Sequence, residues 1–129
     1  MKNRPLAARI GFALAGWRAA WRREKSFRTQ AAVALLGVIA LLILRPAPVW
    51  WALVVLTCAL VLALELVNPA IEAFIDLLHP AIHPEIKYIK DALAEAVLMI
   101  GAAAIIVGAA LAIDSIPRIA TLLKYWKPA

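Results

Sequence analysis

The sequence has little of what soluble enzymes use to build redox, metal or nucleotide sites. Its one cysteine, Cys58, lies in an apolar run, which excludes a disulfide framework and a cysteine-based metal site. We therefore expect Cys58 to be a small buried hydrophobic residue. Only five glycines are present, and they form neither a Walker A loop nor the glycine-rich loop of protein kinases. A soluble kinase fold is excluded on this ground.

Acidic residues are scarce, and the imbalance of charge is concentrated at the N-terminus. Residues 1–30 contain one acid, Glu24, and eight of the fourteen basic residues. Such a segment suits an anionic membrane surface. Nucleic acid is the rival partner, but no zinc, helix-turn-helix or aromatic RNA-binding pattern accompanies the basic residues, so we predict no nucleic-acid binding. The segment also differs from a secretory signal, because no small-residue cleavage site follows it closely.

Apolar residues, in contrast, are abundant. They make up 65% of the chain, more than a soluble domain of 129 residues could bury, which favours insertion into a bilayer. Before the first long apolar run, an apolar stripe at helical spacing predicts an amphipathic surface helix over about residues 5–25. The stripe consists of Leu6, Ile10, Leu14, Trp17 and Trp21.

We predict an all-α membrane protein with one three-span domain over residues 1–113. Prolines at Pro46 and Pro48 end the first span, and a second turn is expected between His79 and Pro84. The remaining segment is predicted to be a polar, basic tail. The predicted spans cover about residues 28–45, 49–78 and 90–113, and the tail covers 114–129.

The distribution of lysine and arginine predicts the orientation. The strongly basic N-terminus should be cytoplasmic, which places the turn at Pro46 outside and the turn after His79 inside. The tail would then lie outside, although Arg118, Lys124 and Lys127 run against this rule locally. We expect the heavier N-terminal bias to decide the orientation.

Polar residues interrupt the second span on one face. Glu65, Asn68, Glu72 and Asp76 are spaced by steps of three and four, so they fall within roughly 80° around a helix and extend over about 16 Å along it. Carboxylates at membrane depth are costly and mark functional sites. The structural alternative is a set of interhelical hydrogen bonds or salt bridges and, for Asp76, a solvated helix end. We favour function, most strongly for Glu65 and Glu72.

Further charged residues are expected at the same cytoplasmic interface. Lys90, Asp91 and Glu95 begin the third span, and Glu24 ends the surface helix. Carboxylates suit Mg²⁺, which usually binds through one or two of them together with substrate phosphates. A lysine suits a phosphate as a point charge. This combination indicates nucleotide phosphate bound at a membrane surface.

These motifs resemble those of the prokaryotic diacylglycerol kinases, a family of small trimeric membrane lipid kinases that includes undecaprenol kinases. The segment from Glu65 to Asp76 is similar to the family signature Glu-x-x-Asn-Ser/Thr-Ala-Ile/Val-Glu-x-x-Ile/Val-Asp. Lys90-Asp91 resembles the later Lys-Asp pair of the family. The surface helix around Trp17 and the segment from Glu24 to Arg28 also match. The resemblance covers about residues 5–113.

The resemblance implies a function and a role for each residue. It implies transfer of the γ-phosphate of ATP to diacylglycerol with Mg²⁺, by a homotrimer in the bacterial inner membrane. Glu65 would be the general base that takes the proton of the lipid hydroxyl, and Glu24 and Glu72 would hold the magnesium. Lys90 would contact the γ-phosphate. The implied ATP-binding set is Glu24, Asn68, Glu72, Asp76, His83, Lys90 and Asp91, and the implied lipid-binding set is Arg18, Trp21, Arg28, Glu65 and Ala94.

The chain departs from the family pattern at three positions. Pro69 replaces a serine or threonine and removes the backbone donor to the Glu65 carbonyl. Phe12 stands where a tyrosine is common. Glu95 stands where a small residue is usual, and we expect Lys87, eight residues earlier, to neutralise it.

Two other functions compete with a diacylglycerol kinase. Undecaprenol kinase lies within the same family, and no residue decides between the two lipids. A non-enzymatic degenerate homologue is the alternative of a different class, supported by Pro69 and Glu95. The presence of the expected Glu, Asn, Asp and Lys residues argues against it.

Overall fold

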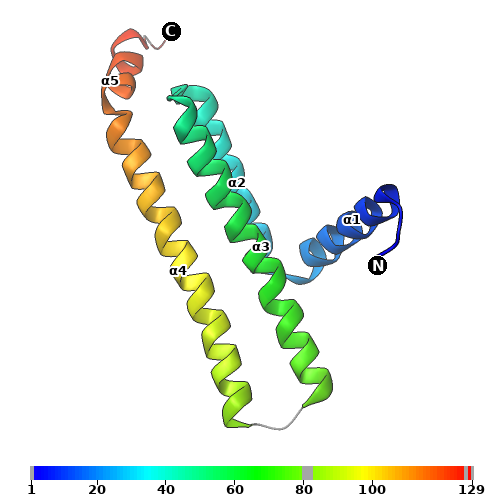
Figure 1. Cartoon of the computed structure of the whole chain (residues 1–129). Helices are drawn as coiled ribbons and strands as arrows, with labels where there is room; N and C mark the ends of the chain where they lie inside the picture. Colours follow the sequence, from blue (N-terminus) through cyan, green and yellow to red (C-terminus); the bar gives the residue numbers. More distant parts are fainter. Residues whose placement is uncertain (1, 80–82, 127, 129) are drawn as a thin grey trace.

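The protein is an assembly of helices. A computed structural model describes residues 2–79, 83–126 and 128, and no strand occurs among them. Figure 1 shows three long helices side by side, with a shorter helix at either end of the chain. The helices are α1 (Leu6–Arg23), α2 (Lys25–Leu44), α3 (Pro48–Leu78), α4 (Pro84–Asp114) and α5 (Ile116–Tyr125).

The three long helices, α2, α3 and α4, are each long and apolar enough to cross a membrane. The chain is a multi-pass membrane protein, and the predicted all-α class with three spans is confirmed. Helix α3 packs against both α2 and α4. The buried cluster is small, formed by Leu41, Val54 and Leu111, and most large apolar side chains are exposed. Exposed apolar surface of this extent is what lipid contact requires.

A single residue, Glu24, separates α1 from α2, and its extended backbone lets α1 turn away from the bundle (Figure 1). Phe27 is fully buried behind this junction, with its ring 4.8 Å from that of Trp17 in an edge-to-face arrangement. Arg28 donates to the backbone carbonyl of Trp21 at 2.6 Å, which satisfies an orphan carbonyl at the end of α1. These contacts fix the direction in which α1 leaves α2.

Prolines define the ends of the long helices but do not interrupt α3. Pro48 and Pro84 occupy the first turns of α3 and α4, where a missing N–H is harmless. For that reason α4 begins at Pro84, earlier than the span expected from about residue 90. Pro69 lies inside α3, which nevertheless continues to Leu78. The turn predicted between the second and third spans lies largely outside the described residues.

The segment predicted to be a polar, basic tail is instead largely helical. Residues Ile116, Ile119 and Leu123 recur at helical spacing, so α5 can form an amphipathic helix. Two contacts fix its start against the turn between α2 and α3. The indole N–H of Trp50 donates to Asp114 at 3.0 Å, and Arg118 donates to the carbonyl of Arg45 at 3.1 Å.

Candidate active site

The polar row of α3 becomes more exposed along the helix. Glu65 is buried, with 7% of its surface accessible, whereas Asn68 and Glu72 are half-buried and Asp76 is exposed. The row therefore leads from a protected carboxylate to one in open surroundings. This gradient follows from the direction of α3, whose first half packs among the spans and whose last turns extend beyond α2 (Figure 1).

A hydroxyl from another helix contacts the buried carboxylate. Ser26, in the first turn of α2, donates from Oγ to Oε2 of Glu65 at 2.8 Å. Hydrogen bonds to an ionised acceptor are stronger than those between neutral groups. The serine side chain thus holds one carboxylate oxygen and leaves Oε1 available. It also ties the α1–α2 junction to the middle of α3.

Three oxygen-bearing side chains near this junction and along the row have no ion-pair or hydrogen-bond partner among the described residues. Oδ1 of Asn68 is buried and accepts no hydrogen bond, and neither Glu24 nor Glu72 forms an ion pair with a described residue. Carboxylate and amide oxygens are ligands for Mg²⁺. No group of three or more His, Cys, Asp or Glu converges within the described part of the chain. By the chemistry of their oxygens, Glu24 and Glu72 are of the kind that could hold a magnesium ion whose remaining ligands are phosphates.

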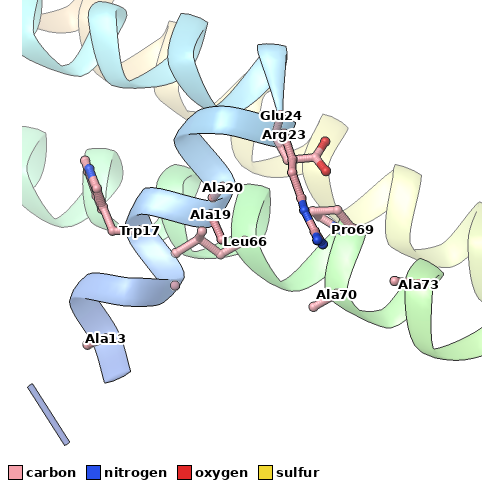
Figure 2. Close-up of a pocket in the computed structure, with 11 residues that line it drawn as sticks. Ala13, Trp17, Ala19, Ala20, Arg23, Glu24, Leu66, Pro69, Ala70 and Ala73 are labelled. Carbon is pink, nitrogen blue, oxygen red and sulfur yellow. The ribbon is translucent and has the colours of Figure 1, made fainter. Parts of the chain in front are cut away.

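A cavity of about 610 Å³ lies between α1 and α3 (Figure 2). Its walls are mostly small apolar side chains, and Arg23 and Glu24 supply its charged groups. The α3 wall of the cavity lies about 100° around the helix from the polar row, and no residue of the row lines the cavity. An apolar cavity of this size with a few polar groups is typical of small-molecule sites. Its remaining lining residues are Ala13, Gly16, Trp17, Ala19, Ala20, Ala70 and Ala73.

The exposed end of the row is joined to α4. Nζ of Lys90 lies 3.0 Å from Oδ1 of Asp76, which brings two predicted nucleotide-binding residues together. Asp91 pairs with Lys87 within α4. The prediction that Lys87 neutralises Glu95 is therefore wrong. Residues four apart lie one turn from each other, whereas residues eight apart are separated by about 12 Å along the axis.

The other predicted site residues lie at three places. His83 caps α4, where its Nδ1 accepts from the backbone N–H of Glu85 at 3.1 Å. Arg18 and Trp21 line a shallow hollow of about 320 Å³ on α1, next to the junction that Arg28 closes. Ala94 is exposed on α4, which lies on the other side of the bundle from α1 (Figure 1). A single chain therefore does not gather the whole predicted lipid-binding set.

Two side chains at the site escaped the sequence analysis. Nothing in the sequence marks Ser26 as a site residue, because a serine in the first turn of a helix is common and its partner Glu65 is distant in sequence. Arg23 was counted only as part of the basic segment, but it lines the cavity beside Glu24. The apolar stripe of the surface helix gives no signal for Arg23, because Arg23 lies about 140° around α1 from the stripe, on the face of small residues that lines the cavity.

Comparison with known proteins finds one matching family and several relatives that are named as lipid kinases. The sequence matches the family described as "Prokaryotic diacylglycerol kinase" over residues 11–112. It is 32% identical to a diacylglycerol kinase of Helicobacter pylori over 84 residues, which are 65% of this chain and 66% of the relative. It is 39% identical to a diacylglycerol kinase of Synechocystis over 103 residues, 78% of this chain and 58% of the relative.

A relative with a different stated activity matches equally well. The chain is 33% identical to an undecaprenol kinase of Bacillus subtilis over 87 residues, 67% of this chain and 71% of the relative. The matches thus span roughly 58% to 71% of the lengths of these relatives. Because the family match covers α2, α3, most of α1 and α4, and every residue of the polar row, the chain belongs to the prokaryotic diacylglycerol kinase family.

Proposed function

We propose that this protein is an ATP-dependent lipid kinase that phosphorylates diacylglycerol and yields phosphatidic acid. The observation that carries the proposal is a buried carboxylate, Glu65, on a membrane-spanning helix that also forms one wall of an apolar cavity. An apolar cavity suits a lipid chain, and a protected carboxylate suits a base for the hydroxyl at the end of that lipid. The membership of the family supports phosphoryl transfer as the reaction.

In the proposed mechanism Glu65 accepts the proton of the lipid hydroxyl as the oxygen attacks the γ-phosphorus of ATP. A bond forms between that oxygen and phosphorus, the bond from phosphorus to the bridging oxygen of ADP breaks, and ADP leaves. Ser26 keeps the Glu65 carboxylate oriented through Oε2. Lys90 stabilises the charge on the transferred group. Magnesium, held by Glu24 and Glu72, would neutralise charge on the ATP phosphates.

The remaining nucleotide-binding residues would order the substrate. In the free protein Asp76 holds Lys90, and Lys87 holds Asp91. These pairs are exposed, so each contributes at most about 1 kcal/mol and can open when phosphate arrives. Asn68 would use its unpartnered Oδ1, and His83 would approach the nucleotide from the start of α4.

The arrangement supports a shared active site in a homotrimer. Within one chain α1 projects away from α4, so Glu24 and the lipid-binding residues of α1 are separated from Ala94 (Figure 1). A neighbouring copy can complete the site by placing its α1 beside this α4. We further propose that the enzyme lies in the bacterial inner membrane with the N-terminus in the cytoplasm, where ATP is available. The basic N-terminal segment supports that orientation.

Undecaprenol is the second candidate substrate, because one relative of comparable identity is an undecaprenol kinase. Both lipids present a primary hydroxyl at the end of an apolar body, and the cavity between α1 and α3 could accept either. A degenerate, non-enzymatic homologue remains the third candidate. Pro69 and Glu95 support it, whereas the buried, hydrogen-bonded state of Glu65 argues for a working base.

The purified protein in micelles, offered labelled ATP and Mg²⁺, will test these candidates. We expect label to pass to diacylglycerol and to a lesser extent, or not at all, to undecaprenol when each lipid is supplied alone. Faster transfer to undecaprenol would reassign the substrate. No transfer to either lipid, from protein that is folded by circular dichroism, would refute the kinase proposal.

Replacing Ser26 with alanine should lower kcat about tenfold and leave the KM for ATP nearly unchanged. The variant loses one hydrogen bond to a charged acceptor, and such bonds are worth about 1.5–3 kcal/mol. Ser26→Thr should restore most of the activity because it retains the hydroxyl. Thr29→Ala is the matched control, since that hydroxyl donates to the Lys25 carbonyl within α2. An equal loss in Thr29→Ala would show that Ser26 acts only on the stability of α2.

A further inference from the structure

A second, shallow cavity of about 350 Å³ lies at the end of the bundle opposite the exposed Asp76 near the end of α3. It is formed where α5 meets the last turn of α2, and two arginines, Arg45 and Arg118, line it together with apolar side chains. We propose that this cavity binds the phosphate of an anionic membrane phospholipid. The proposal is independent of the kinase activity. The apolar lining residues are Ile43, Leu44, Pro117 and Leu122.

No residue that the structure describes neutralises the charges of the cavity. Neither Arg45 nor Arg118 forms an ion pair with a residue that the structure describes. The nearby acid, Asp114, accepts a hydrogen bond from Trp50. Arg118 uses one terminal nitrogen for the carbonyls of Leu44 and Arg45, at 3.4 and 3.1 Å, and a guanidinium carries further N–H donors in a fixed plane. That geometry suits two oxygens of one phosphate.

The backbone at Arg45 adds a second indication of function. Arg45 has φ 46°, and it is the single non-glycine residue with positive φ in the described ranges. It caps α2 in the left-handed conformation, where glycine is the usual residue. Strained residues of this kind cluster at functional sites. An arginine here brings a cation to the cavity that a glycine could not supply.

The position of the cavity along the membrane-spanning helices favours a phospholipid over a soluble anion. The cavity lies at the end of a transmembrane helix, with Trp50 and Trp51 in the first turn of the next helix, and tryptophans are enriched at the level of lipid headgroups. The exposed side chains of Ile43 and Leu122 continue the apolar surface of the spans from the cavity. A headgroup phosphate could therefore contact the arginines while its acyl chains lie along α2. Helix α5 itself lies beyond residues 11–112, the part that matches the family.

The test measures lipid retention by the full-length protein in micelles, using native mass spectrometry with dioleoyl phosphatidylglycerol or dioleoyl phosphatidylcholine. We expect phosphatidylglycerol to bind about tenfold more tightly, because choline neutralises the phosphate of the other lipid. Arg45→Gly and Arg118→Gln should each remove most of this preference. Lys124→Gln should retain it, because Lys124 lies on α5 but does not line the cavity.

Arg45→Gly separates binding from folding. Glycine relieves the strained backbone, so the Tm of this variant without added lipid should equal or exceed that of the wild type. An undiminished preference for phosphatidylglycerol in both arginine variants would overturn the proposal. An equal loss of that preference in Lys124→Gln would also overturn it, because it would show that the anionic lipid is attracted by the general positive charge of α5. Displacement of phosphatidylglycerol by millimolar inorganic phosphate would overturn the choice of a lipid as the ligand.

Discussion

Replacing Glu65 with glutamine should reduce lipid phosphorylation by a factor of about 10³, the largest effect expected from any single substitution in this protein. Proton transfer by a positioned base typically contributes about 10²–10⁴ to the rate. Glutamine keeps the size of the side chain and an oxygen that can accept from Ser26, so only the basicity is lost. We expect kcat to fall while the KM for ATP changes little, because the proposed nucleotide contacts lie farther along α3 and on α4.

The loss of activity in Glu65→Gln should not come from unfolding. Removing a charge from a buried position in a membrane helix is neutral or stabilising, so the Tm should not decrease. Asp114→Asn is the matched control, because it neutralises a carboxylate at the opposite end of the bundle. Measured in the same micelles, it should retain activity within about threefold, since it touches no part of the proposed site. If the activity of Glu65→Gln were as high as that of Asp114→Asn, Glu65 could not be the general base.

The helices were predictable where local signals mark them. The apolar runs and the prolines at positions 46 and 48 predicted the three spans, and all three are helices, although α4 begins six residues before the start expected at about residue 90. The end of the surface helix, expected at about residue 25, also lies close to the observed break at Glu24, although no proline marks it. The break at Glu24 has neither proline nor glycine, and it is held by the packing of Phe27 against Trp17 and by Arg28 on the end of α1. Contacts between helices decide that boundary, and spacing along the sequence does not reveal them.

Helix α5 is a different case, because its signal was present. Ile116, Ile119 and Leu123 recur at helical spacing, but the basic residues of the segment dominated its interpretation as a tail. The structure explains why a cation lies there. Arg118 satisfies carbonyls at the end of α2, which is the negative end of that helix dipole. A basic residue on this side is therefore a local structural requirement and need not argue against the predicted orientation.

The candidate site was predictable as far as one helix extends. The spacing of Glu65, Asn68, Glu72 and Asp76 was enough to place them on one face, and the structure adds that their exposure increases along it. The residues that contact that face could not be predicted from the sequence. Ser26 contacts Glu65 across 39 positions, and the choice of Lys87 between Asp91 and Glu95 depends on helix geometry.

Lys90→Gln should lower kcat/KM for ATP about a hundredfold, the second largest effect that we expect. A charged contact to a phosphate is worth about 1.5–3 kcal/mol, and part of it is made only in the transition state. The KM for ATP should therefore rise while kcat falls. Loss of the ion pair with Asp76 should scarcely affect the Tm, because the pair is open to solvent, with the Asp76 side chain 64% and the Lys90 side chain 39% exposed.

Lys87→Gln provides a closely matched control for this result. Both lysines lie in the first turns of α4 and each forms one ion pair, but Lys87 binds Asp91 within its own helix and Lys90 reaches across to the polar row of α3. If the net positive charge at this end of α4 were what attracts ATP, the two variants would lose similar activity and raised salt would weaken both. If the position of Lys90 beside the polar row is what matters, as we expect, the activity of Lys87→Gln should stay within about threefold of the wild type.

The variant Lys90→Arg separates the charge of the side chain from its shape, because arginine retains the positive charge but lacks the compact ammonium group that Asp76 now holds. Recovery of less than about a tenth of wild-type activity in Lys90→Arg would show that the shape of the lysine side chain, as well as its charge, is required.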